Sequence, residues 1–324
     1  MMTDHVQSSI NDGQPVRFCR SGPGIRDAAV VAVLRAAFFV VNHTVRRGHY
    51  TTCRMVGTLA SSGAYAEFIV PGGGRFRAHP RDGYWMRSLS VQRRYEPELL
   101  PVVEKALQVG MRFLDCGANL GWWAVIAGST QQGPERVLAV EASPSTFRGL
   151  SQHHRLNGDT FRTLQAAVWS RSGETVDFVE ARESAASSVA QTSLPMMVTG
   201  RHRRVPTATL DELLTAVAPD GEPVLCKLDV EGAEVEALST SELIRSGDVA
   251  VVFEDHGSDP TSATSMWFLE RGYIVHVPAP DGTLMRITDI ASINAFKVDP
   301  ARGYNFLAWA VGGAAEQLFG PQVR

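Results

Sequence analysis

Apolar strands that alternate with amphipathic helices over the C-terminal two-thirds of the chain are the feature that most constrains its fold. Each strand is short, and a helical pattern follows it within a few residues. Such alternation predicts a mostly parallel sheet with helices on both faces, which is an α/β architecture. The predicted strands are 112–115, 136–140, 161–169, 223–230 and 249–254, and the predicted helices are 98–109, 122–128, 144–156, 209–217, 231–238 and 261–270.

The first 90 residues differ in character and carry no chemical motif. The predicted elements are a helix at 27–41 and short strands within 51–70 and at 75–79. Residues 1–25 are rich in Ser, Gly, Asp and Pro and are expected to be frayed. The apolar stretch Ala28–Val41 contains Arg35 and is too short to cross a bilayer, so no membrane span is expected. We therefore predict an N-terminal α/β extension, 1–90, and a main domain, 91–324.

Composition argues against a nucleic-acid partner, and the cysteine spacing argues against a zinc site or a disulfide framework. The chain has 31 Lys and Arg against 34 Asp and Glu, and a net charge of -3. Nucleic acid is not expected as a partner, because phosphate binding needs a basic surplus. Four scattered cysteines, Cys19, Cys53, Cys116 and Cys226, have neither zinc-site spacing nor the pattern of a disulfide framework. A reducing, cytoplasmic location is therefore expected.

Polar side chains follow the predicted strands at the points where ligands bind in sheets of this kind. Asp115 ends the first strand and Glu141 follows the second. Asp229 and Glu254 end two later strands, and His256 comes just after Glu254. Because these strand ends meet at one edge of a parallel sheet, the residues predict a single site. A solvated strand end is the alternative for each residue taken alone.

A glycine loop, Gly117 to Gly121, joins the first strand to its helix and lets a ligand approach the backbone closely. It lacks the paired glycines of a pyrophosphate-binding G-x-G-x-x-G loop, and Asp115 would repel a pyrophosphate. A ligand that bears an ammonium and a sulfonium suits this charge better. Glu141 could accept hydrogen bonds from the ribose hydroxyls of an adenosine, a group that nicotinamide cofactors also contain.

The segment Cys226–Glu234 places Lys227 and Asp229 on the same face of a strand. Buried charges need partners, so these two residues either form a structural ion pair or lie at the open strand end within the site. Glu231 is either a functional carboxylate or a residue at a helix start, where negative charge is favoured. His256 could act as a general base, because histidine titrates near neutral pH.

Taken in order, these residues resemble the FkbM-type S-adenosylmethionine-dependent methyltransferases. The most specific elements are DxGANxG at 115–121 and KxDVEGxE at 227–234, and the resemblance spans roughly 95–310. The chain departs from the family's pattern at Ala142, where proline is common, and at the tryptophan pair that opens the helix after the glycine loop. Further matching stretches are 95–98, 137–141, 143–144, 156–158, 166–173, 209–213 and 251–254. We expect substrate choice to lie in the part before residue 75, which carries no match.

The resemblance implies a class I (Rossmann-like) methyltransferase fold, a seven-stranded sheet whose final antiparallel hairpin would use 273–277 and 305–310. It implies S-adenosylmethionine as the cofactor, with the methionine end at Asp115 and the glycine loop, the ribose at Glu141, and the adenine at the end of the third strand. The expected cofactor-binding residues are Glu96, Asp115, Gly117, Asn119, Gly121, Glu141, Ala142, Ala166 and Ala167. Glu96 is expected to close over the cofactor.

The predicted function is O-methyl transfer to a hydroxyl of a sugar or natural-product small molecule, which is what most members of the family do. A hydroxyl is a weak nucleophile and needs a base, for which the candidates are His256, Asp229 and Glu254. Lys227 would orient the acceptor or balance Asp229. Alternatively, Asp229 and Glu254 would hold a Mg²⁺ ion that lowers the pKa of the hydroxyl.

Three other hypotheses stay open. The chain could be a carboxyl- or N-methyltransferase of a small molecule or peptide natural product. It could be a non-catalytic member that binds the cofactor or a partner protein, although none of the strand-end acids is lost. A nicotinamide-dependent oxidoreductase is disfavoured by the missing G-x-G. Neither the acceptor nor an oligomeric state follows from the sequence.

Overall fold

The computed structural model describes residues 16–43, 48–131, 133–181, 188–189, 200–255, 259, 261–298 and 304–320. The chain divides into two compact units, Met1–Tyr95 and Glu96–Arg324. No helix in the described ranges combines the length and the apolar character that crossing a bilayer requires.

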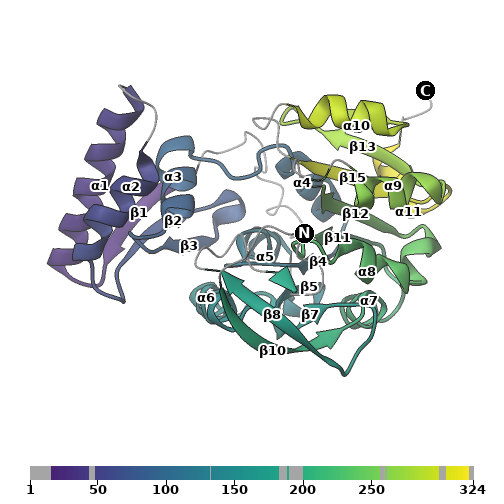
Figure 1. The fold of residues 1–324 in the computed structure, drawn as a ribbon, viewed down its shortest axis with the longest axis horizontal. Coiled ribbons are helices and arrows are strands. Elements are labelled where there is room, and N and C mark those ends of the chain that lie inside the picture. The colour runs from purple at the N-terminus through teal and green to yellow at the C-terminus, as the bar shows by residue number, and fades with distance from the viewer. Residues whose placement is uncertain are drawn as a thin grey trace, which may run out of the picture. The chain divides into compact units, whose positions relative to one another are not determined.

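The first unit is a small antiparallel sheet with helices (Figure 1). Its elements are β1 (Arg17–Gly22), α1 (Ile25–His43), α2 (His49–Val56), β2 (Tyr65–Ile69), β3 (Arg75–Ala78) and α3 (Gly83–Arg87). The strand order is β1-β2-β3. The buried carboxylate of Glu67 on β2 pairs with Arg20 of β1 at 3.0 Å and with Arg75 and Arg77 of β3 at 2.6 and 2.7 Å. These ion pairs join all three strands.

Two expectations for this unit are wrong. Residues 17–22 belong to the segment expected to be frayed, yet they form β1 because β2 offers them a pairing edge. Residues 51–56 lie in the range predicted to contain short strands, but they belong to α2. His49 and Cys53 are four residues apart and both buried, so packing of one helical face overrides the strand propensity of the threonines between them.

The second unit contains an eight-stranded sheet of order β14-β13-β15-β12-β11-β4-β5-β6 (Figure 1). Its strands are β4 (Arg112–Cys116), β5 (Val137–Glu141), β6 (Arg162–Gln165), β11 (Val224–Leu228), β12 (Val249–Glu254), β13 (Ile274–Pro278), β14 (Leu284–Ile287) and β15 (Asn305–Trp309). The ladders from β6 through β12 are parallel, and β15 runs antiparallel between β12 and β13. The predicted α/β, Rossmann-like architecture is confirmed, with one difference. The two strands expected to form the final hairpin are neighbours, but β14 extends the predicted seven strands to eight.

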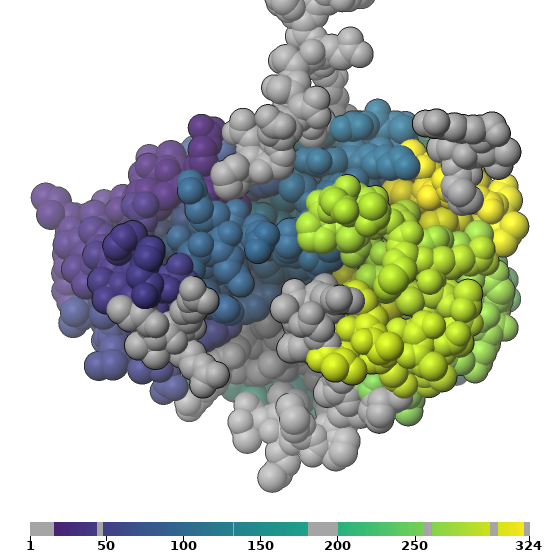
Figure 2. Space-filling view, turned by 90° about the horizontal axis from the view of Figure 1, so that it is seen from above, coloured from purple at the N-terminus to yellow at the C-terminus, as the bar shows by residue number. Residues whose placement is uncertain are grey.

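Helices cover both faces of this sheet. They are α4 (Leu100–Gln108), α5 (Trp122–Thr130), α6 (Pro144–Leu156), α7 (Leu210–Val217), α8 (Glu234–Ser239), α9 (Ala263–Glu270), α10 (Ile290–Lys297) and α11 (Ala314–Phe319). Helices α7 to α10 share one apolar core with alternate strand residues such as Leu114, Cys226 and Val251. Because successive strand residues point to opposite faces, Asp115 and Lys227 lie on the other face, where α5 packs. Figure 2 shows the elements after residue 261, coloured yellow-green, gathered on one side of the view.

A second sheet is inserted between β6 and α7. Its order is β7-β10-β8-β9, and its strands are β7 (Ala167–Val168), β8 (Thr175–Ala181), β9 (Ser188–Val189) and β10 (Gly200–Ala208). The predicted third strand, 161–169, is therefore divided. Its first part is β6 in the main sheet, and after Ala166 the chain pairs with β10 instead.

Candidate functional site

The structure brings four of the predicted strand ends to one edge of the main sheet. Asp115 near the end of β4 is the register partner of Lys227 on the neighbouring strand β11. Glu141 is the last residue of β5 on the other side of β4, and Glu254 is the last residue of β12 beside β11. Asp229 follows β11 directly. Parallel strands with adjacent positions thus produce the expected group of polar side chains.

The glycine loop is a tight turn that packs on the loop after β11. The backbone N–H groups of Gly117 and Ala118 both donate to the Val140 carbonyl at 2.9 Å, which closes the turn against β5. Gly117 has φ of +80°, and a Cβ there would lie 1.7 Å from the carbonyl oxygen of Asp229. Only glycine fits this close approach. Asn119, in the middle of the turn, has φ of +52°, a conformation that asparagine tolerates better than most residues.

Glu141 binds the backbone of two loops. Its carboxylate accepts from Asn119 N at 2.9 Å and from Ser143 N at 2.7 Å. Ser143 in turn caps α6 by accepting from the N–H of Thr146. Burial raises the pKa of Glu141 to about 7, although these two N–H groups oppose the shift. Each carboxylate oxygen has a further lone pair, so Glu141 can also accept from a ligand.

One carboxylate oxygen of Asp115 has no hydrogen-bond partner in the described part of the chain. Its Oδ2 accepts from Ala124 N in the first turn of α5 at 3.2 Å. Its Oδ1 is buried and has no hydrogen-bond donor among the described residues. Burial raises the pKa of Asp115 to about 7, and Lys227 opposes that shift. A buried acceptor in this state is destabilising until a donor reaches it, so it marks a place where a ligand donor would bind favourably.

Three carboxylates surround one ammonium at this edge, and we call Glu96, Asp115, Asp229 and Lys227 the acidic cluster. Lys227 Nζ donates to Asp229 Oδ2 at 2.6 Å, and both side chains are largely buried. Burial lowers the pKa of Lys227, but Asp229, Glu96 and Asp115 together raise it well above its usual value. Glu96 accepts from Trp123 Nε1 at 2.6 Å, and burial raises the pKa of its carboxyl. The acidic cluster has an excess of negative charge that favours a cationic ligand.

The match to a family model covers this site. The family model for the methyltransferase FkbM domain matches residues 115–275, a range that begins at Asp115 and includes the loop after β11. The chain belongs to the FkbM methyltransferase family. It is similar to the crystal structure of the methyltransferase FkbM from Methylobacillus flagellatus KT, with 17% sequence identity and a TM-score of 0.37. That alignment covers 61% of this chain and 43% of the other protein's length. No curated protein matches the chain.

In this FkbM chain the loop after β11 is held by Glu234. Its carboxylate accepts from Val230 N at 3.0 Å and from Gly232 N at 3.0 and 3.2 Å. Helix α8 begins at Glu234 rather than at 231, the start that the sequence predicts, so Glu231 lies in the loop with φ of +55°. A non-glycine residue in this conformation is strained, and such residues concentrate at functional sites.

The three candidates for a general base differ in their surroundings, and one of them lies outside the described residues. Glu254 is half-buried at the end of β12, and Asp229 forms the ion pair with Lys227 described above. His256 lies outside the described residues. Asp255, between these positions, has a structural role, because its buried carboxylate accepts from Lys297 Nζ at 2.9 Å and from Ser265 N at 3.1 Å.

The alternative of a Mg²⁺ ion at Asp229 and Glu254 gains no support from the geometry. The ammonium of Lys227 already lies 2.6 Å from the Asp229 carboxylate, where a metal cation would compete with it. Among the described residues, no group of three or more His, Cys, Asp and Glu side chains could hold a metal ion. The residues present therefore do not fit a magnesium centre.

The residues expected to line the adenine lie where β6 ends. Ala166 and Ala167 are buried at the point where the chain leaves the main sheet. Ala142 packs against a small apolar cluster to which Ala167 also belongs. These small side chains adjoin the end of β5, where Glu141 lies.

Glu180 is a residue near this site that the sequence analysis did not identify. Its buried carboxylate, on β8 of the inserted sheet, accepts from Ser143 Oγ and Ser145 N at 2.9 Å at the start of α6. Arg203 of β10 also donates to it at 3.2 Å. Arg203 lies on a strand, and its guanidinium forms an ion pair with this carboxylate. No local pattern marks Glu180, because its partners are far away in the sequence.

Proposed function

We propose that the chain is an S-adenosylmethionine-dependent O-methyltransferase that acts on a hydroxyl of a sugar or natural-product small molecule. The observation that carries the proposal is the buried Oδ1 of Asp115, which lacks a partner among the described residues and lies in the acidic cluster beside a turn that only glycine fits. The ammonium of a methionine moiety would supply the missing donor, and the sulfonium would add a second positive centre. Membership of the FkbM family supports the same assignment.

The residues of this edge suit the three parts of the cofactor. Asp115 and the glycine loop would bind the methionine end. Glu141 has lone pairs for the ribose hydroxyls, and its pKa of about 7 leaves it partly ionised at neutral pH. Ala166 and Ala167 would lie against the adenine. The cofactor supplies an activated methyl group, and the protein's part is to bind, to orient and to accept a proton.

Orientation is the larger contribution that the protein can make. Holding the acceptor oxygen in line with the methyl group can lower the barrier by about 7–11 kcal/mol at best. The hydroxyl proton must leave as the new C–O bond forms, and Asp229, Glu254 or His256 would accept it. Lys227 would hold the Asp229 carboxylate in place, because its Nζ lies 2.6 Å from Asp229 Oδ2.

Calorimetric titration with S-adenosylhomocysteine tests the cofactor assignment. We expect saturable 1:1 binding to the full chain and no binding of NADH at the same concentrations. Labelled S-adenosylmethionine with a panel of sugars, polyketide alcohols, carboxylic acids and amines then tests the acceptor class. Absence of S-adenosylhomocysteine binding would reject the proposal. Methylation of acids or amines alone would replace it with carboxyl- or N-methyl transfer, and binding without any transfer would favour a non-catalytic member.

Substitution of Asp229 by asparagine tests the proposed base. With a hydroxyl acceptor we expect kcat to fall at least a hundredfold, because removal of a general base loses about 10²–10⁴ in rate. The dissociation constant for S-adenosylhomocysteine should stay within about threefold, and the fall should be seen in kcat rather than in KM. Asp220→Asn, at an exposed turn position, is the matched control. If Asp229→Asn keeps more than half of the wild-type kcat, Asp229 is not the general base, and Glu254 and His256 remain as the candidates.

Two further assignments belong to this proposal. The N-terminal unit is a candidate substrate-side subdomain, because the FkbM match begins only at residue 115. A reducing, cytoplasmic location is supported by four free cysteines, of which Cys53, Cys116 and Cys226 are buried.

A further inference from the structure

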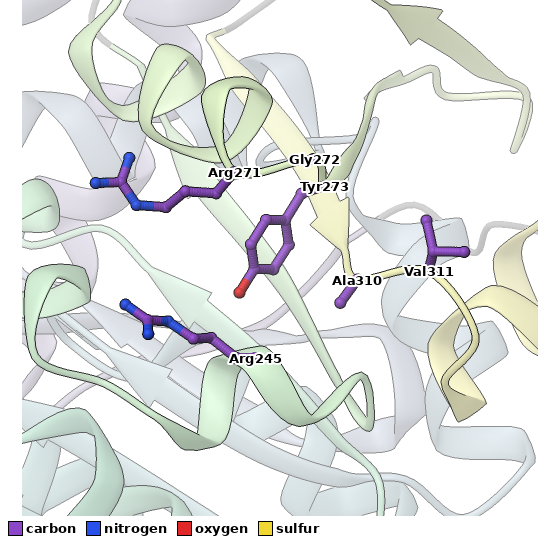
Figure 3. A pocket seen from close by; sticks show the side chains of 6 residues that line it. All are labelled: Arg245, Arg271, Gly272, Tyr273, Ala310 and Val311. Atoms are coloured by element: carbon purple, nitrogen blue, oxygen red, sulfur yellow. The ribbon is translucent and has the colours of Figure 1, made fainter.

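A pocket of about 480 Å³ lies in the second unit at the edge opposite the candidate site (Figure 3). It is found where β13 begins and β15 ends, next to the segment that precedes β12. The acidic cluster, by contrast, lies where β4 and β11 end. We call the pocket at the opposite edge the arginine pocket. Its lining residues are Arg245, Arg271, Gly272, Tyr273, Ala310 and Val311.

Tyr273 carries a buried hydroxyl that nothing in the described protein satisfies. The residue is 8% exposed, and its Oη has no hydrogen-bond partner among the described residues. Ring contacts with Trp267 and Phe268, at 5.9 and 5.2 Å between centroids, fix the phenol. Figure 3 shows its hydroxyl directed toward the side of the pocket where Arg245 lies. An unpaired buried hydroxyl is destabilising, so a bound acceptor would stabilise this arrangement.

Two arginines, Arg245 and Arg271, line the same pocket. Arg271 is held over the Trp267 ring at 4.5 Å and donates through Nη1 to the Trp267 carbonyl at 3.1 Å, which leaves most of its N–H groups available. Arg245 approaches Glu242 only at 3.4 Å, and both side chains are more than half exposed, so this contact is weak. Burial raises the pKa of Tyr273, and both arginines oppose the shift. The phenol therefore stays protonated and able to donate.

We propose that the arginine pocket binds an oxyanion, a phosphoryl or carboxylate group of a small molecule that is not a reactant of methyl transfer. Three side chains with donor groups line the pocket, and two of them are guanidinium groups that match the paired oxygens of such anions. Ala310 and Val311 provide an apolar wall for the rest of the ligand. The position at the opposite edge of the sheet separates this ligand from the cofactor and the acceptor.

Titration with inorganic phosphate and with acetate, at constant ionic strength, tests this proposal on the full chain. We expect one of the two anions to bind saturably, and the tighter one identifies the group as phosphoryl or carboxylate. Tyr273→Phe and Arg245→Gln should each weaken that binding at least fivefold, while Arg155→Gln, an exposed arginine on α6, should not change it. Affinity for S-adenosylhomocysteine should be unchanged in all three variants.

Thermal unfolding separates loss of the site from loss of the fold. Without anion, Tyr273→Phe should unfold at the wild-type temperature or above it, because the variant removes an unsatisfied buried hydroxyl. The proposal is overturned if neither anion binds more tightly than chloride, or if Tyr273→Phe and Arg245→Gln bind the preferred anion as the wild type does.

Discussion

Replacement of Asp115 by asparagine should weaken S-adenosylhomocysteine binding at pH 8 by about tenfold to a hundredfold while it stabilises the protein without ligand. The affinity falls because a buried hydrogen bond to a charged group contributes about 1.5–3 kcal/mol, and 1.4 kcal/mol is a factor of ten. The stability rises because Asp115 is buried and its Oδ1 has no hydrogen-bond partner among the residues that the structure describes. The substitution replaces one of the three mutually repelling carboxylates of the acidic cluster by an uncharged amide.

The sign of the pH dependence follows from the raised pKa of Asp115, about 7 against an ordinary 3.8. Between these two values the folded state holds a proton that the unfolded state has lost, so the wild type loses stability as pH rises from about 4 to about 7. The advantage of Asp115→Asn should grow over this range and reach about 1–3 kcal/mol above pH 7. Urea unfolding at pH 5 and pH 8 measures it.

Ligand affinity should have the opposite pH dependence. Below pH 7 the carboxyls of Asp115 and Glu141 take up protons, so the wild type should bind S-adenosylhomocysteine more weakly at pH 6 than at pH 8. In Asp115→Asn, the pH dependence of S-adenosylhomocysteine affinity should be smaller, because only the contribution of Glu141 remains. Asp220→Asn should match the wild type in both assays. If Asp115→Asn bound S-adenosylhomocysteine with wild-type affinity at pH 8, the methionine end could not lie at Oδ1.

Lys227→Met should be the most destabilising of the changes considered, with a loss of about 3–5 kcal/mol at pH 8, because removal of one partner leaves a buried charge uncompensated. Lys227 is the one cation in the acidic cluster, and its side chain is 6% exposed. The loss should shrink at pH 5.5, where the remaining carboxyls can bind protons. Denaturant unfolding at the two pH values tests both the size and the trend.

Lys105→Met provides the control for that change. Lys105 is exposed on α4, so its replacement should alter the free energy of unfolding by no more than about 0.5 kcal/mol. The double variant Lys227→Met with Asp229→Asn should regain part of the loss, since the unpaired carboxylate is then absent. A loss below about 1 kcal/mol for Lys227→Met at pH 8 would show that the cluster does not depend on its ammonium.

Much of the main domain could be predicted because its signals are local. The strand at 249–254 and the helix that Pro144 begins were predicted at the bounds of β12 and α6. Acids at the ends of parallel strands meet at one edge for topological reasons, so the sequence order of Asp115, Glu141 and Asp229 was enough to group them.

The remaining features depend on contacts that no local pattern reveals. Helix α2 exists because His49 and Cys53 are buried together, and β1 exists because β2 is beside it. The unpartnered oxygen of Asp115 and the hydroxyl of Tyr273 are visible only when every possible donor and acceptor nearby has a position. Contacts of high sequence separation, such as Ser143 with Glu180, are of the same kind.

The carboxylate of Glu180 connects the inserted sheet to the start of α6, next to the candidate site. Burial opposes ionisation, but Ser145, Ser143 and Arg203 hold the pKa of Glu180 down at about 2, so it remains an anion at every physiological pH. Helix α6 starts under this anion, directly after the loop that Glu141 fixes. A sequence change that shifts β8 along β10 would therefore be transmitted to the loop that Glu141 fixes, where we propose that the ribose binds. Sequence changes in the insertion could then alter the affinity for the proposed cofactor while leaving every proposed binding residue intact.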